Sequence, residues 1–232
     1  MRYFWDMSDV PRDVQLRIDP QLKRACPSLA IGCVQGAVKI ESSGAPLLEK
    51  LNQRAQQVVL NLPPDKISAQ PAVAATREAY RALGKDPSRY RGSSEALLRR
   101  VTSGKGLYFI NNVVDINNLV SLESFLPVGT YDRSKIADLV TFRTGAPGET
   151  YKGIGKDSLN LENLPIFADV SGPFGSPTSD SERAMIAAST RYIAMMIIDF
   201  SGTTNLEQLS QRAIDLLREH ASGAALSYRI IA

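Results

Sequence analysis

The side chains with the most distinctive chemistry in this sequence are a single histidine, His220, and two cysteines, Cys26 and Cys33. Zinc sites are built mainly from histidine and cysteine ligands, so no metal centre is expected from this set. A Ser-His-Asp or Cys-His nucleophile would have to use His220. Because that residue lies late in an amphipathic segment, we interpret it as a surface or helix-end histidine.

The two cysteines do not form the framework of a disulfide-rich secreted protein. We interpret them as buried free thiols in a reducing compartment. Segment 1–13 lacks the apolar core of a signal peptide, and the apolar run 193–198 is too short to span a bilayer. These features predict a soluble, cytoplasmic protein without membrane contact. No G-x-x-x-x-G-K-[ST] loop occurs, so no nucleotide cofactor is expected.

Periodicity of the apolar residues predicts the elements that would position functional side chains. The chain has 232 residues, is 44% hydrophobic and 22% charged, and has no long linker, which indicates one globular domain. Helical spacing covers 46–60, 71–83, 93–101, 113–125 and a last helix with a capping box at Thr204 and Glu207. Strands are predicted at 29–40, 139–143, 164–168, 190–200 and 225–231. Helices that precede strands in this way favour an α+β fold.

The charge is distributed unevenly along the chain. The net charge is only +3, but residues 77–105 contain eight basic and three acidic side chains. Three tyrosines, Tyr80, Tyr90 and Tyr108, are interleaved with these cations. A surface that neutralises phosphates and stacks bases would need both groups. A solvated basic surface without a partner is the alternative interpretation.

One stretch of the chain is specific enough to indicate a family. Residues 80–101 read YRALGKDPSRYRGSSEALLRRV, and residues 107–136 read LYFINNVVDINNLVSLESFLPVGTYDRSKI. This pattern resembles the B3/B4 domain of the phenylalanyl-tRNA synthetase β subunit, especially its free-standing single-domain relatives. The likeness covers about 18–202. It implies an α+β layered sandwich of β-sheets with helices packed on one side. We therefore expect a single domain at 18–232, preceded by an extension at 1–17.

The resemblance also implies a function, because the synthetase domain hydrolyses the ester of mischarged tRNA. Free-standing relatives look like candidates for the same reaction in trans, with aminoacylated tRNA as the partner. Such an ester needs a positioned water and polar contacts, and no metal. The implied catalytic residues are Asp180, Ser181 and Thr130. The implied substrate-binding residues are Asn112, Asp115, Asn118, Gly129, Asp132 and Glu149, with Asn117 as a further amide. The implied RNA-binding residues are Arg89, Arg91, Arg99, Arg100 and Lys105.

The sequence departs from the synthetase pattern at one conspicuous position. Where the synthetase has a histidine beside its editing pocket, this chain has Gly129. The amino acid that the synthetase domain chiefly removes is tyrosine. The acid that recognises its hydroxyl is also absent from the loop at 172–178, so the synthetase's specificity does not transfer. Two alternatives therefore remain open beside the deacylase. One is a non-catalytic RNA-binding module, and the other is a pocket for a free amino acid or its derivative.

Overall fold

The computed structural model describes residues 11–155 and 157–232. The helices are α1 (Pro20–Ala25), α2 (Ala45–Asn61), α3 (Pro71–Ala82), α4 (Ser93–Thr102), α5 (Asn112–Ser124) and α6 (Leu206–His220), with short 3-10 turns at Pro64–Ala69, Arg133–Lys135 and Glu182–Ala184. The strands are β1 (Gln15–Ile18), β2 (Ala30–Ala37), β3 (Val128–Asp132), β4 (Leu139–Thr144), β5 (Thr150–Lys152), β6 (Ser158–Asn160), β7 (Pro165–Asp169), β8 (Gly172–Gly175), β9 (Tyr192–Asp199) and β10 (Ala224–Ile231).

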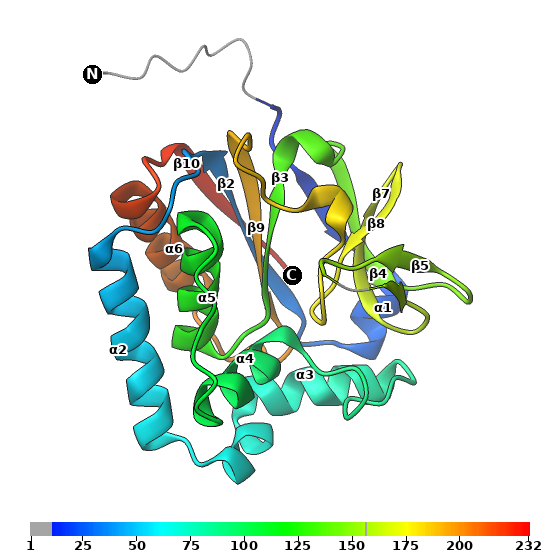
Figure 1. Ribbon diagram of the computed structural model, residues 1–232. Coiled ribbons are helices and arrows are strands. Elements are labelled where there is room, and N and C mark those ends of the chain that lie inside the picture. Colours follow the sequence, from blue (N-terminus) through cyan, green and yellow to red (C-terminus); the bar gives the residue numbers. More distant parts are fainter. Residues whose placement is uncertain (1–10, 156) are drawn as a thin grey trace.

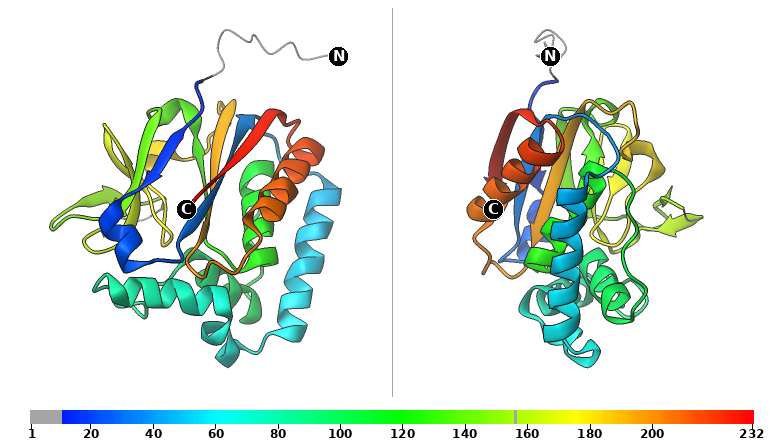
Figure 2. Two further views of the ribbon diagram at one scale, coloured as in Figure 1. Left: turned by 180° about the vertical axis from the view of Figure 1, so that it is seen from behind. Right: turned by 60° about the vertical axis from the view of Figure 1, so that its left-hand side comes forward.

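Two four-stranded sheets and a set of helices form three layers (Figures 1 and 2). One sheet has the order β10-β2-β9-β3, the other has the order β1-β4-β7-β8, and β5 and β6 form a separate hairpin. Helices α2, α5 and α6 cover one face of the first sheet, and the second sheet lies on its other face. This arrangement confirms the expected α+β layered sandwich with helices on one side.

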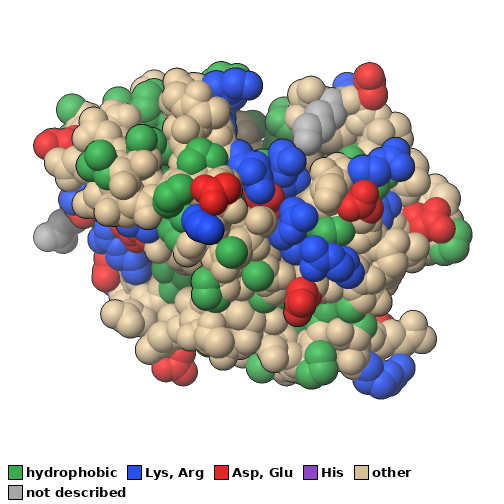
Figure 3. All heavy atoms as spheres, turned by 90° about the horizontal axis from the view of Figure 1, so that it is seen from below, with side chains coloured by type: hydrophobic (Ala, Val, Ile, Leu, Met, Phe, Trp, Pro, Cys, Tyr) green, Lys and Arg blue, Asp and Glu red, His purple; other side chains and the backbone are tan. Residues whose placement is uncertain are grey.

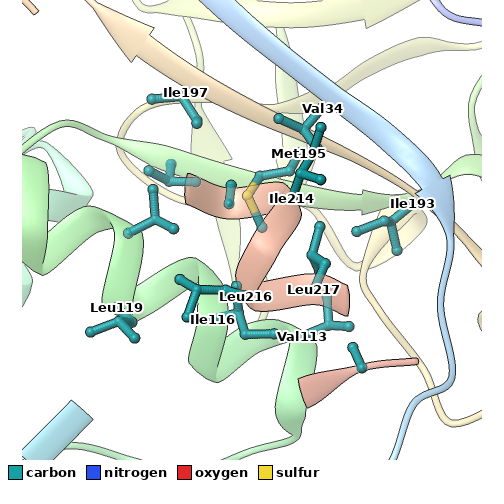
Figure 4. Close-up of a cluster of buried hydrophobic side chains, with 14 of the residues drawn as sticks. Val34, Val113, Ile116, Leu119, Ile193, Met195, Ile197, Ile214, Leu216 and Leu217 are labelled. Atoms are coloured by element: carbon teal, nitrogen blue, oxygen red, sulfur yellow. The ribbon is translucent and has the colours of Figure 1, made fainter. Parts of the chain in front are cut away.

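Strand β9 shows why the layers form, because it is apolar on both faces. Its odd-numbered residues Ile193, Met195 and Ile197 pack with the helices (Figure 4), whereas Met196 and Ile198 pack with the second sheet. Successive side chains of a strand point to opposite faces, so a continuous apolar run can be buried between two layers. Burial of such side chains is the main driving force for assembling the three layers.

The observed ends of several elements refine the predictions. Asn205 caps α6 by accepting a hydrogen bond from Gln208 N at 3.0 Å, so the predicted capping box at Thr204 is wrong by one residue. The backbone N–H of Thr204 instead donates to Asp199 Oδ2 at 3.1 Å. His220 is the last residue of α6, as interpreted.

Two further expectations concern the amino-terminal part of the chain. Both cysteines are buried and free, which confirms that they are buried free thiols. Strand β1 pairs in parallel with β4, from Gln15 opposite Leu139 to Ile18 opposite Phe142. The boundary expected between 17 and 18 therefore falls inside strand β1. The apolar side of this strand packs on the sheet core. Residues 1–10 of the expected extension lie outside the described residues.

Candidate functional site

A cavity of about 260 Å³, lined by both polar and apolar side chains, lies between α4, α5, the start of β3 and the loop at 176–181. Its polar lining side chains come from three segments that are distant in the sequence: Ser93, Arg100, Asn117, Asn118, Ser121 and Thr178. The backbone N–H of Ser93, at the start of α4, donates to Pro177 O at 2.6 Å, which fixes the loop against the helix. The cavity therefore combines hydroxyl, amide and guanidinium groups on a scaffold held together by a backbone hydrogen bond.

Helix α5 directs its amides toward this cavity because its other face is buried. Ile116, Leu119 and Val120 pack in the core, which leaves Asn117 and Asn118 on the polar side (Figure 4 labels Ile116 and Leu119). Ser121 lies one helical turn after Asn117 and lines the same cavity. Asn118 is thus one predicted substrate-binding residue that reaches a cavity.

Thr130, a residue of strand β3, lies behind Asn117 of helix α5. Its Oγ1 donates to Asn117 Oδ1 at 2.9 Å. Thr130 is paired in the sheet with Met195, whose side chain packs among the helices, so both side chains are on the helix face. Because the amide oxygen of Asn117 accepts this bond, its NH₂ group remains a donor. The pair can present an oriented N–H to a ligand in the cavity.

Asp180 lies on the opposite face of β3 from Thr130. The hydroxyl of Tyr131 donates to Asp180 Oδ1 at 2.7 Å, and the Tyr131 ring is fully buried beside Phe174, with 4.9 Å between the ring centres. Neighbouring residues of a strand point to opposite faces, so the structure separates Asp180 from Thr130. Burial raises the pKa of Asp180 to about 6, although the Tyr131 hydrogen bond opposes this rise.

The same tyrosine explains the glycine at position 129. A Cβ atom on Gly129 would lie 2.4 Å from the Tyr131 hydroxyl oxygen, and one on Gly175 would lie 2.2 Å from it. Real Cβ contacts are never this short, so a histidine could not occupy position 129 without displacing Tyr131. The space that a histidine would take is filled by the Tyr131 side chain.

The loop at 176–181 is held by buried hydroxyl groups. Tyr151 donates to Ser176 Oγ at 3.1 Å and also to Ser179 O, and the hydroxyls of Tyr80 and Thr178 are 2.8 Å apart. Ser181 lies at the end of this loop, and its buried Oγ has no hydrogen-bond partner among the described residues. Asp180 and Ser181 are therefore neighbours in the chain, but neither of them lines the cavity.

Two predicted substrate-binding residues, Asn112 and Asp115, stabilise the start of α5. The amide of Asn112 donates to Lys39 O at 2.9 Å and to His220 O at 3.0 Å, which ties α5 to the ends of β2 and α6. Asp115 is fully buried, and burial raises its pKa. Neither residue lines a described cavity together with Thr130 or Asp180.

Asp132 and Glu149 are likewise engaged with other parts of the chain. Asp132 accepts from Ser134 N at 2.9 Å and from Thr190 Oγ1 at 2.7 Å. Glu149 accepts from both terminal nitrogens of Arg143, at 2.6 and 2.8 Å, and this interaction lowers the pKa of Glu149. Both carboxylates are thus engaged in contacts within the fold.

The predicted RNA-binding arginines surround a buried carboxylate. Glu95 is only 2% exposed and is contacted by Arg77 at 3.0 Å, Arg99 at 2.9 Å and Arg91 at 3.5 Å. One carboxylate cannot neutralise three guanidinium groups, so this cluster keeps a positive charge. Lys and Arg side chains gather on the end of the molecule that carries α3 and α4, with a few acidic side chains among them (Figure 3).

The remaining cations and the three tyrosines differ in exposure. Arg89 and Lys105 are exposed, whereas Arg100 lines the cavity. Tyr80 is fully buried and the Tyr90 ring is covered by Lys85 Nζ at 3.9 Å, but Tyr108 is 65% exposed. Of the three tyrosines expected to stack bases, Tyr108 is the one whose position suits that role.

Several important residues were missed by the sequence interpretation, namely Ser93, Glu95, Thr178 and Tyr131. For Ser93 and Thr178 the sequence offers only turn and cap patterns. The sequence does contain a signal for Tyr131. This residue lies two residues after Gly129, so both residues are on the same face of the strand, and the glycine leaves space for the large side chain. No cluster of three or more His, Cys, Asp or Glu side chains that could hold a metal ion is found in the described part of the chain. In the same part, no helix has the length and apolarity to cross a membrane.

Comparisons with known proteins identify the family. The model of the B3/4 domain matches residues 75–221, which is more than half of the chain and runs from within α3 to the end of α6. No curated protein matches the sequence. One similar solved structure is an N-terminal fragment of the phenylalanyl-tRNA synthetase β subunit from Pyrococcus horikoshii, with 12% identity and a TM-score of 0.44. The match covers 96% of this chain and 53% of that chain, so this chain spans about half the length of the fragment. The extent of the family match, over the segment that forms the cavity and the basic cluster, shows that the chain belongs to the B3/4 domain family.

Proposed function

We propose that this protein binds aminoacylated tRNA and hydrolyses the ester of mischarged tRNA in trans. The observation that carries the proposal is the position of the cavity beside helix α4, which also carries part of the basic cluster around Glu95. Both features belong in part to helix α4, because Arg100 lines the cavity and the preceding residue, Arg99, contacts Glu95. An aminoacyl end bound in the cavity would bring tRNA phosphates to the surrounding cations.

Asn117 is the group best suited to act on the ester. Its NH₂ donor is oriented by Thr130, so it can donate to the carbonyl oxygen as negative charge develops there. Asn118 and the hydroxyls of Ser93 and Thr178 line the same space and can hold the α-amino group and the attacking water. An aminoacyl ester is already activated, so positioning and charge stabilisation can account for its hydrolysis. In this proposal Asp180 is a positioning residue that fixes the wall of the cavity.

The test is deacylation of a panel of misacylated tRNAs by the wild type, Asn117→Ala and Asn118→Ala. Removing one donor to a developing oxyanion typically costs roughly 100- to 1,000-fold in rate. We expect a loss of this size for Asn117→Ala and a smaller one for Asn118→Ala. Asn61→Ala, at the exposed end of α2, is the matched control and should keep the full rate. A wild-type rate equal to the spontaneous rate for every tRNA would sink the enzymatic proposal.

A non-catalytic tRNA-binding module is the second candidate. It is favoured by the Tyr131 side chain, which fills the space of the histidine expected at position 129. In that case the wild type would bind the tRNAs without accelerating deacylation. The substitutions at Asn117 and Asn118 would then change affinity and leave the hydrolysis rate at its spontaneous value.

A further inference from the structure

The connection between α4 and α5 exposes three consecutive large apolar side chains. Tyr108, Phe109 and Ile110 are 65%, 47% and 64% exposed, and we call them the 108–110 patch. Single exposed apolar side chains are common on protein surfaces, but contiguous patches usually mark binding sites.

The 108–110 patch is anchored at both ends. On one side, Leu107 packs against the apolar clusters of the helical layer. On the other side, the backbone N–H of Ile110 donates to the buried carboxylate of Asp115 at 3.2 Å, and Ser43 Oγ donates to the same carboxylate at 2.5 Å. A ligand that binds to the patch therefore does not have to order it first.

Arg100 connects the patch to the cavity. Its guanidinium carbon is 3.7 Å from the centre of the Tyr108 ring, and its Nη2 donates to Lys105 O at 3.1 Å. The guanidinium covers one side of the ring, and the Tyr108 residue as a whole stays mostly exposed. Because Arg100 also lines the cavity, the exposed ring lies at the edge of the proposed aminoacyl site.

We propose that the 108–110 patch stacks an unpaired base of the bound RNA, next to the nucleotide that carries the ester. This inference rests on the proposed function, in which the aminoacyl end occupies the cavity. Exposed aromatic rings beside cations are the combination that binds single-stranded nucleic acid, because the rings stack on bases and the cations neutralise phosphates. Lys105, three residues before Tyr108, is exposed and can supply that charge.

The test measures binding of a short single-stranded RNA whose penultimate base is a fluorescent purine analogue that stacking quenches. The wild type should bind it and quench it. Tyr108→Ala should weaken binding roughly 5- to 150-fold and abolish the quenching, because one stacking contact is lost. Tyr108→Trp should restore both, and Val170→Ala, at a side chain that is 91% exposed between β7 and β8, should change neither. The salt dependence of binding should be the same in all these proteins, since no charge is altered.

The possible failures of the two proposals can be told apart. Salt-dependent binding that Tyr108→Ala leaves unchanged, without quenching, would overturn the stacking inference and leave tRNA binding in place. If the wild type does not bind the RNA at any salt concentration, both proposals fail. If Tyr108→Ala instead changes the sedimentation of the protein and not its RNA affinity, the patch is a contact between protein chains and the inference is wrong.

Discussion

At the scale of single residues, Tyr131 and Asp180 form a hydrogen-bonded pair on one face of β3. The tyrosine fills the space beside Gly129 and donates to a carboxylate whose pKa is raised by burial to about 6. In the proposed function, the chemistry at the cavity is therefore assigned to the amide of Asn117 on the other side of the strand. The separation of these two groups follows from the alternation of side chains along a strand.

The raised pKa of Asp180 predicts a pH dependence of stability. A carboxyl group with a higher pKa in the folded state binds its proton more tightly there, so its contribution to stability is complete at low pH and is lost as the pH rises through about 6. Asp180→Asn should remove this loss. Between about pH 4 and pH 7, its free energy of unfolding should fall less than that of the wild type, by up to roughly 3 kcal/mol.

Urea unfolding of both proteins across this pH range measures the difference. The comparison with Asp180→Asn is needed because other carboxyls act in the opposite direction. Glu149, for example, has a lowered pKa and adds stability as the pH rises. Parallel pH profiles for the two proteins would contradict the assignment to Asp180.

At the scale of elements, α4 is attached to α3 by a buried carboxylate. Glu95 lies in the first turn of α4, and Arg77 of α3 reaches it with a side chain that is 18% exposed. The same carboxylate holds Arg91 and Arg99, so the helix pair and the basic cluster depend on one residue. The cavity also depends on it indirectly, because Ser93 and Arg100 belong to the same helix.

Replacing that carboxylate should therefore be costly. We expect Glu95→Ala to lower the free energy of unfolding by about 3 kcal/mol, because it removes the buried partner of Arg77, whose side chain is only 18% exposed. The control is Glu123→Ala, which breaks the more exposed pair with Arg212 and should cost only about 0 to 1 kcal/mol. Chemical denaturation gives both values, and equal effects of the two substitutions would refute the buried anchor.

At the scale of the whole molecule, the basic end formed by α3 and α4 should determine RNA affinity through its exposed cations. Arg89→Ala and Lys105→Ala should each weaken tRNA binding. Each should also reduce the slope of log affinity against log salt by about 0.9 if the side chain contacts a duplex phosphate. Arg218→Ala, on α6, should leave the slope unchanged. A salt titration of tRNA binding measures these slopes, and affinity independent of salt would rule out a phosphate-binding surface.

Much of the molecule could be predicted because its long elements carry their own periodic patterns. The helices α2 to α6 and the strands β2, β9 and β10 follow from local apolar spacing. Strand β3 was missed because Gly129 weakens its pattern, and its pairing with β9 joins segments more than sixty residues apart. Strand β1 was missed because it is short and lies at the edge of its sheet.

The site was less predictable for the same reason. The family pattern led to Asn118 and Arg100, which do line the cavity. It also led to Asn112 and Asp132, whose partners His220 and Thr190 are distant in the sequence and could not be foreseen from local spacing. Glu149 is bound by Arg143, only six residues earlier, across the turn after β4. Whether a polar side chain is free or already engaged depends on tertiary contacts, which a single sequence does not reveal.

The most direct measurement for the central claim is the rate of deacylation of mischarged tRNA at saturating concentrations of the wild type and of Asn117→Ala. We predict acceleration over the spontaneous rate by the wild type and a loss of roughly 100- to 1,000-fold in the variant, while both still bind tRNA. Spontaneous rates in the presence of both proteins, with tRNA demonstrably bound, would contradict catalysis at this cavity.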